Sequence, residues 1–237
     1  MNFYKKIRNV AFLIEPEKAH RLAISALKTG LHLPSDNNSK LLKQEVLGLT
    51  FDNPIGLAAG FDKNAEVIKS MFSLGFGFIE VGTITPFPQK GNSKPRVFRL
   101  EEDKAIINSL GFNNKGSKKV RKNLLKLKKN FFENKIIGVN LGKNKNSLNS
   151  IDDYLFGMEQ LGDISSYITI NISSPNTEGL RDLQLRGNIE NLIKKIISKR
   201  EEIENINRKP IFIKISPDLN EDQLRDIALI ALANNID

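Results

Sequence analysis

The first 33 residues carry two short amphipathic patterns. In the first, apolar residues recur at helical spacing, with basic residues between them: Phe3, Ile7, Val10 and Ile14, then Lys5, Lys6 and Arg8. Glu15-Pro16 interrupts this pattern, and a second apolar stripe follows at Ala19, Leu22, Ala23, Ala26 and Leu27. Gly30 ends that stripe, and the polar stretch from Pro34 to Ser39 marks a domain boundary. We expect a helical domain over residues 1–36 and a second domain over residues 37–237.

From about residue 53 the pattern changes to short apolar runs that alternate with helical periodicity. The runs that we predict as strands are Ile55–Ala59, Phe78–Val81, Ile136–Leu141, Tyr167–Ile172 and Ile211–Ile215. The predicted helices are Ala65–Leu74, Lys118–Phe132, Asp152–Leu161, Ile189–Ile203 and Glu221–Ala233. The strands lack strict alternation, which is typical of parallel strands buried on both faces.

Five strand–helix units in a row predict an α/β protein, either a sheet or a (β/α)₈ TIM barrel. A complete barrel needs about 250 residues for itself. The sequence ends at Asp237, directly after a predicted helix and where a sixth strand should begin. We therefore expect an incomplete barrel of about five units, and a natural chain that continues.

The residue inventory narrows the chemistry. Cysteine is absent, which excludes disulfides, thiolate metal sites and a cysteine nucleophile, and the two histidines, His20 and His32, lie near the N-terminus. We expect no metal site. The net charge of +9 is compatible with nucleic acid or anionic lipid. The densest basic run, Lys115–Lys129, nevertheless has apolar residues at helical spacing and predicts a surface helix with a solvated face. No apolar run approaches the roughly 18 residues of a transmembrane helix.

Amide and lysine side chains follow the predicted strands. They include Lys63, Asn108, Asn140, Asn171 and Lys214. In a parallel barrel the carboxyl ends of the strands carry the functional groups. Amides donate and accept hydrogen bonds, which suits a planar ligand with carbonyl and ring N–H groups, such as a pyrimidine or a flavin. Lysines without nearby carboxylates suit an anionic ligand. Any one of these loops alone is explained as well by ordinary turn residues.

From Pro16 to Asp237 the chain resembles the class 2 dihydroorotate dehydrogenases. The motifs that carry the resemblance keep their order and spacing: AAGFDKN (58–64), GFGFIEVGTITPFPQKGNSKPRVFRL (75–100), NSLGFNN (108–114), GVNLGKNK (138–145), DDYL (152–155), NISSPNT (171–177) and IKISPDL (213–219). The resemblance implies an FMN oxidoreductase of pyrimidine (UMP) synthesis. Such an enzyme oxidises dihydroorotate to orotate, passes hydride to FMN and uses membrane quinone as electron acceptor.

The resemblance also implies the roles of particular residues. Ser174 matches the base that removes the C5 proton, and serine is a weak base unless its site stabilises the alkoxide or relays its proton. The implied substrate residues are Lys63, Asn108, Ser109, Leu110, Gly111, Phe112, Asn171 and Asn176. The implied FMN residues are Ala59, Gly60, Phe61, Asp62, Lys63, Thr83, Asn140, Asn171 and Lys214. His20 and Arg99 match the quinone end of the family's N-terminal tunnel.

The same resemblance implies a peripheral enzyme on the cytoplasmic face of the inner membrane, in contact with anionic lipid. We expect a monomer that binds no nucleic acid. Two alternatives remain at this point. An FMN barrel similar to the tRNA dihydrouridine synthases would explain the basic charge, although those enzymes use a cysteine acid. A non-catalytic fragment that binds a membrane surface would explain the N-terminal helices.

Overall fold

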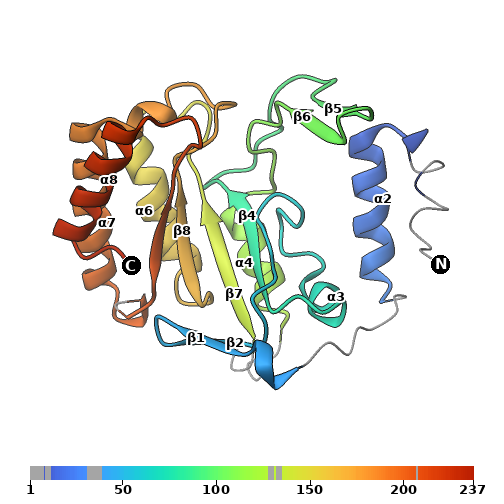
Figure 1. Cartoon of the computed structure of the whole chain (residues 1–237), viewed down its shortest axis with the longest axis horizontal. Helices are drawn as coiled ribbons and strands as arrows, with labels where there is room; N and C mark the ends of the chain where they lie inside the picture. The colour runs from blue at the N-terminus through green and yellow to red at the C-terminus, as the bar shows by residue number, and fades with distance from the viewer. Residues whose placement is uncertain (1–7, 9–11, 31–38, 128–130, 132–134, 207) are drawn as a thin grey trace.

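The computed structural model describes residues 8, 12–30, 39–127, 131, 135–206 and 208–237. Its centre is a parallel sheet of five strands in the order β3-β4-β7-β8-β9. Their bounds are β3 Gly56–Leu57, β4 Phe78–Ile84, β7 Ile136–Leu141, β8 Tyr167–Asn171 and β9 Ile211–Lys214. All five run the same way, so that their carboxyl ends meet at the upper edge in Figure 1. β3 and β9 are the two edges, and the described strands do not close into a barrel.

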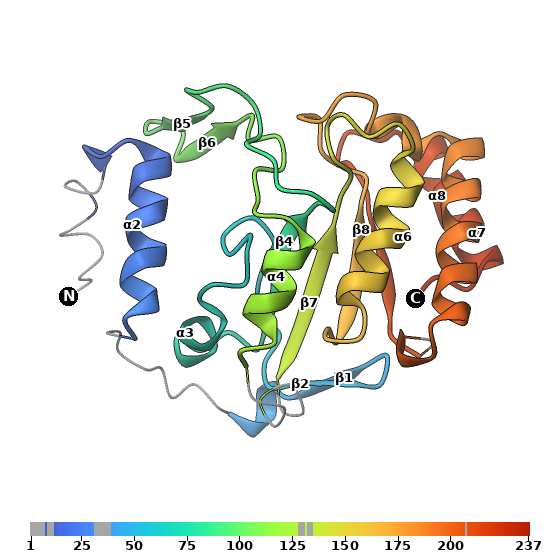
Figure 2. The same ribbon diagram turned by 180° about the vertical axis from the view of Figure 1, so that it is seen from behind.

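A helix follows each strand of this sheet. The helices are α3 Ile68–Ser73, α4 Ser117–Leu124, α6 Ser150–Leu161, α7 Arg186–Glu202 and α8 Glu221–Ala233. α4, α6, α7 and α8 pack against one another in chain order. Figure 2 shows α4 and α6 in front of the strands, on the side away from the viewer of Figure 1. Right-handed strand–helix–strand units that place their helices in one layer form an α/β barrel-like fold.

The core explains why the strands read as unbroken apolar runs. Every residue of β8 is buried, as are five of the six residues of β7. Their side chains pack on one side against Tyr154, Met158 and Leu161 of α6, all fully buried. The prediction that the strands are buried on both faces is therefore confirmed for β7 and β8, but it is wrong for the edge strands β3 and β9, which are partly exposed.

Two predicted helices are shorter than expected. α3 begins at Ile68 rather than Ala65, because the Asp62 carboxylate accepts the N–H groups of Glu66 and Val67 and holds them in a loop. α4 ends at Leu124, its last buried apolar residue, and residues 125–127 form turns instead of helix. The bounds predicted for β7 and α8 are confirmed.

Two antiparallel hairpins were not predicted. β1 (Gln44–Val46) and β2 (Leu49–Phe51) form a hairpin that lies across the lower ends of the strands in Figure 1. β5 (Val97–Leu100) and β6 (Ala105–Asn108) form a second hairpin inside the long excursion after β4. The second hairpin packs beside α2, at the upper edge of the molecule.

Helix α2 spans Pro16–Lys28, where the second amphipathic pattern predicted a helix, but its buried residue is Ile24, outside the predicted stripe, and Leu22 of that stripe is exposed. The Glu15 side chain accepts the N–H groups of residues 17 and 18, and Pro16 occupies the first turn, where its missing N–H costs nothing. Most of the first amphipathic pattern and of the predicted boundary falls on residues that the structure does not describe, and both stay predictions. In the described part of the chain, no helix has the length and apolar character needed to cross a membrane.

Candidate active site

The carboxyl ends of three central strands carry an interlocked polar cluster. Thr83 Oγ1 donates to Asn140 Oδ1 at 2.6 Å. Asn171 Nδ2 donates to both Thr83 Oγ1 at 3.0 Å and Asn140 Oδ1 at 3.2 Å. All three side chains are buried and come from β4, β7 and β8. The family resemblance implied these residues for the flavin, and the structure brings them together in one hydrogen-bonded cluster.

The carboxylate of Glu80 lies below this cluster, farther from the carboxyl ends of the strands. Glu80 Oε1 accepts from Asn140 Nδ2 at 2.7 Å, and its other oxygen accepts from Thr169 Oγ1 at 2.9 Å and Tyr167 OH at 3.2 Å. Burial, with a smaller contribution from the Glu80 charge, raises the pKa of Tyr167, which therefore stays a hydrogen-bond donor. Because Asn140 must turn its amide nitrogen to Glu80, its oxygen is left to face Thr83 and Asn171. Sequence reasoning missed Glu80, although a carboxylate inside an apolar strand is itself a signal.

Two glycines shape the space next to the cluster of Thr83, Asn140 and Asn171. A Cβ at Gly142 would lie 2.6 Å from Thr83 Cγ2 and 2.9 Å from Phe112 Cε2, so glycine is what lets the Phe112 ring approach the backbone here. Gly60 has φ +116°, and a Cβ added to it would meet no heavy atom within 4 Å, so its backbone faces open space. A planar ligand can therefore lie directly against the chain at Gly60.

Lys63 is a partly buried cation with no ion-pair partner among the described residues. Its Nζ donates to Asn113 Oδ1 at 2.6 Å, and no described carboxylate forms an ion pair with it. Burial is the largest cause that lowers the pKa of Lys63 to about 8; the charge of Arg96 adds to it, and the charge of Glu17 partly opposes it. A bound anion would reverse this shift, since an opposite charge favours the ammonium form. Asn113, which orients Lys63, was not predicted.

Ser174 lies in the loop after β8, partly buried. Its Oγ accepts a hydrogen bond from the backbone N–H of Asn176 at 3.2 Å. The side chain of Asn176 donates from Nδ2 to the backbone oxygen of Asn108 at 3.3 Å. The structure thus joins the loop of the predicted base to the loop predicted to wrap the substrate. A donor aimed at a serine oxygen favours its deprotonated form.

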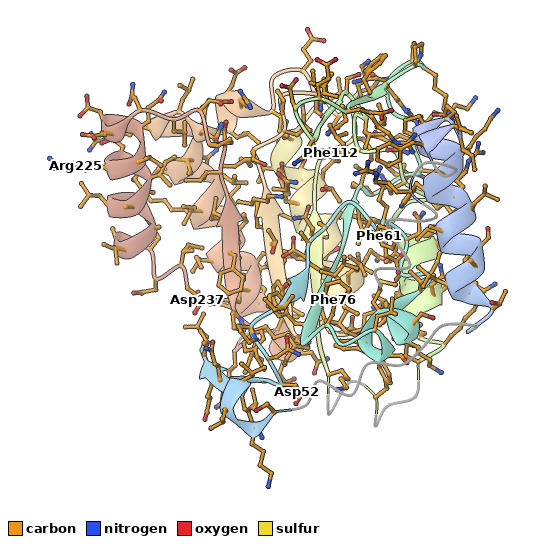
Figure 3. All side chains as sticks on the ribbon, turned by 45° about the vertical axis from the view of Figure 1, so that its right-hand side comes forward. Asp52, Phe61, Phe76, Phe112, Arg225 and Asp237 are labelled. Atoms are coloured by element: carbon orange, nitrogen blue, oxygen red, sulfur yellow. The ribbon has the colours of Figure 1, made fainter. Side chains whose placement is uncertain are left out.

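The remaining predicted flavin residues are placed as follows. Lys214 ends β9, is exposed, and its side chain has no hydrogen bond or ion pair with any described residue. The Asp62 carboxylate accepts backbone N–H groups of its own turn, and burial raises its pKa. Ala59 and Phe61 are partly exposed beside Gly60. Figure 3 shows Phe61 between the sheet and α2, with Phe112 nearer the upper strand ends.

The predicted quinone residues lie on a cavity of about 660 Å³ between α2 and the strand ends. His20 Nε2 is 2.8 Å from the backbone oxygen of Phe61, and the two rings meet edge to face. Arg99 donates to the backbone oxygens of residues 12 and 14, and its guanidinium lies 4.7 Å from the Phe12 ring centre. Lys63 and Leu110 line the same cavity. The cavity therefore connects the face of α2 with the side of Lys63.

No group of three or more His, Cys, Asp and Glu side chains suited to a metal ion occurs among the described residues. Fold and site together define an α/β barrel-like protein with a polar ligand site at the carboxyl ends of its strands. The family model described as "Dihydroorotate dehydrogenase" matches residues 41–237. The chain belongs to the dihydroorotate dehydrogenase family.

Curated relatives named dihydroorotate dehydrogenase (quinone) include one from Bartonella tribocorum, 51% identical over 231 residues, and one from Rhizobium etli, 48% identical over 239 residues. These alignments cover 96% and 99% of this chain, but 63% and 65% of the relatives. A crystal structure of DHODH from Eimeria tenella in complex with ferulenol matches with a TM-score of 0.88 and 42% identity, over 94% of this chain and 65% of that one. The chain spans just under two thirds of the length of the curated relatives that it matches.

Proposed function

We propose that this chain takes part in the oxidation of dihydroorotate to orotate, with FMN as cofactor and quinone as the final electron acceptor, in pyrimidine synthesis. The family membership and the names of the relatives support this reaction. The single observation that carries it is that the site combines a lysine without an ion pair to any described residue, Lys63, with a serine hydroxyl that accepts a backbone hydrogen bond, Ser174. Lys63 suits a carboxylate and donates to Asn113, and Ser174 Oγ accepts from the backbone N–H of Asn176. The Asn176–Asn108 contact joins the loop of Ser174 to the segment that leads to Asn113.

The residues present fit FMN. Gly60 leaves open space along the backbone, and the cluster of Thr83, Asn140 and Asn171 offers donors and acceptors to a planar ring. Lys214, whose side chain bonds no described residue, supplies a cation at the neighbouring strand end. When bound, FMN would supply the hydride acceptor of the reaction. A cation close to a flavin ring favours the electron-rich reduced form.

The protein's own groups would perform the proton chemistry. Lys63 would bind the substrate carboxylate, and Ser174 Oγ would take the proton from C5 while hydride leaves C6, which forms the C5–C6 double bond of orotate. To act as this base, Oγ must first release its own proton to solvent; the N–H of Asn176 stabilises the negative charge of the resulting alkoxide, and the C5 proton then neutralises it. The loop of Asn108 to Phe112 would cover the substrate and exclude water.

We propose quinone as the electron acceptor because the cavity lined by His20 and Arg99 reaches Lys63 from the side of α2. We propose a peripheral monomer that contacts anionic lipid on the cytoplasmic face of the inner membrane through its N-terminal segment. Binding to anionic vesicles would then weaken with salt.

An acceptor panel tests the function. The full-length protein, loaded with FMN, is supplied with dihydroorotate and either a quinone, fumarate or NAD, and orotate formation is followed by absorbance. Turnover with quinone alone is the expected result. Turnover with fumarate or NAD in place of quinone would contradict the acceptor. Reduction by NADPH with activity on tRNA, and none on dihydroorotate, would contradict the whole proposal.

A further inference from the structure

Arg96 joins α2 to the loop that precedes β5. Its Nε and Nη2 donate to the two carboxylate oxygens of Glu17 at 3.0 and 2.8 Å, and its Nη1 donates to the backbone oxygens of Lys90 and Asn92, both at 2.7 Å. The Arg96 side chain is 6% exposed and that of Glu17 is 14% exposed. Lys94 adds an ion pair with Glu17 at 3.4 Å. A bidentate, buried pair with further hydrogen bonds fixes geometry far more strictly than a surface ion pair.

The loop held by Arg96 is bonded in turn to the substrate loop and to the loop of Ser174. Asn92 Nδ2 donates to the backbone oxygens of Ser109 at 3.0 Å and Asn176 at 3.1 Å. The backbone N–H of Asn92 donates to Leu110, and that of Ser109 donates to Arg96. The guanidinium therefore joins α2 to the loop before β5, and Asn92 of that loop joins it to the start of the substrate loop and to the loop after β8.

Arg96 and the substrate loop pack closely against each other at Gly91. A Cβ at Gly91 would lie 2.2 Å from the Leu110 backbone oxygen and 2.8 Å from Arg96 Nη1. Gly91 has φ +77°, a conformation that also favours glycine. Gly91 therefore packs directly between the guanidinium and the backbone of the substrate loop.

We propose that Glu17 and Arg96 are positioning residues for the substrate, which make α2 and the substrate loop one coupled unit. This inference rests on the proposed function, because it takes orotate as the ligand of that loop. Neither residue touches Ser174 or Lys63 through a hydrogen bond, so both position the substrate loop through Asn92 and the backbone at Ser109 and Leu110. Their charges also act on Lys63, whose pKa Arg96 lowers and Glu17 raises, and Arg96→Lys, which keeps the charge, separates positioning from this charge effect. α2 then does more than border the cavity of His20: its first turn sets the shape of the substrate site.

The far end of α2 offers a matched control. There Ser70 Oγ donates to the backbone oxygen of Leu27 at 2.7 Å, and Ser70 is 7% exposed. This bond also anchors α2 to the barrel, but it ends on α3 and has no connection to the loop of Asn92. General loosening of α2 should follow from loss of either anchor, whereas substrate positioning should follow only from loss of the Glu17–Arg96 pair.

Coupling of this kind is reciprocal. If the position of α2 changes the affinity for orotate, then orotate must stabilise the position of α2 by the same factor. A helix that moves on a membrane surface or on quinone entry would thus change substrate affinity, and bound substrate would order the helix.

The test is calorimetric titration of orotate into the FMN-loaded, full-length protein and its Glu17→Gln, Arg96→Lys and Ser70→Ala variants. Glu17→Gln keeps the shape but removes the charge, and Arg96→Lys keeps the charge but cannot hold four partners. Both should weaken orotate binding by about five- to tenfold, the lower range of typical coupling between sites. Both should raise the KM for dihydroorotate with little change in kcat, and Ser70→Ala should leave both within about twofold of wild type.

Hydrogen exchange of the wild-type protein gives an independent readout that needs no variant to fold. Orotate should slow exchange in the first turns of α2 as well as in the substrate loop. Orotate affinity that is the same in Glu17→Gln and Ser70→Ala, or α2 exchange that orotate leaves unchanged, would overturn the inference. Failure of the wild-type protein to bind orotate at all would instead refute the proposed function.

Discussion

Lys63 makes the sharpest prediction, because its pKa of about 8 lies within the range where binding can be measured. Burial lowers this pKa, so the ammonium form is the one that loses population as pH rises. At pH 7 about nine tenths of the side chain is charged, and at pH 9 about one tenth is. If the charged form binds the orotate carboxylate, affinity should be nearly constant below about pH 7 and should be about tenfold weaker at pH 9 than at pH 7.

The size of the whole interaction follows from the site. A hydrogen bond to a charged group contributes about 1.5–3 kcal/mol, so Lys63→Met should weaken orotate binding roughly 10- to 150-fold at pH 7 and remove the pH dependence. Orotate titrations at several pH values measure both effects. Because a bound anion raises the pKa of Lys63, binding at pH 8–9 should also take up protons, which titration in two buffers reveals. The Lys199→Met variant, which alters a lysine paired with Glu159 on the outer helix layer, should keep the wild-type profile. An affinity that stays constant from pH 7 to pH 9 in the wild-type protein would refute the assignment of Lys63 to the anion.

Two further predictions concern buried polar clusters. Lys209 Nζ donates to the backbone oxygens of residues 162, 163 and 165 at 2.6, 2.9 and 2.5 Å. Lys209→Met should lower the free energy of unfolding by about 2–3 kcal/mol, or Tm by about 4–12 °C. The control Lys199→Met should lower the free energy of unfolding by less than about 1 kcal/mol. Equal Tm values for the two variants would contradict this. Glu80→Leu leaves three donors without an acceptor and should weaken FMN binding at least about tenfold. Glu80→Gln should stay within about threefold of wild type, since the two hydroxyls can turn to accept from the amide. Fluorescence titration of FMN measures both variants, and tight binding by Glu80→Leu would show that the cluster of Thr83, Asn140 and Asn171 does not depend on this carboxylate.

The elements that the sequence predicts well are those whose pattern is local and unbroken. β7 is a mostly apolar run between Lys135 and Gly142, and α8 carries a complete capping box of Asn220 and Gln223, so both have the predicted bounds. The β5–β6 hairpin escaped prediction because its turn, residues 101–104, contains only charged side chains and no glycine or asparagine. That hairpin packs beside α2, a contact that no local pattern reveals.

The residues of the candidate site likewise fall into those that the sequence predicted and those that it did not. Strand-end position alone brought Lys63 and Asn171 into the prediction, and the motif resemblance added Ser174. Residues that act through distant partners were missed: Asn113 is 50 positions from the Lys63 that it orients, and Glu80 lies 60 positions from Asn140. Such pairings depend on which residues the sheet register brings together, and a single sequence does not specify them.

The central claim is that Ser174 removes a proton from dihydroorotate while hydride leaves for the flavin, and single-turnover flavin reduction tests it most directly. Under anaerobic conditions, dihydroorotate is mixed with the FMN-loaded protein and bleaching of the flavin is followed by stopped flow. The account predicts rapid bleaching in the wild-type protein and a rate about 10²–10⁴-fold lower in Ser174→Ala, with orotate affinity unchanged, because only the base is lost. Bleaching of Ser174→Ala at the wild-type rate would contradict the account.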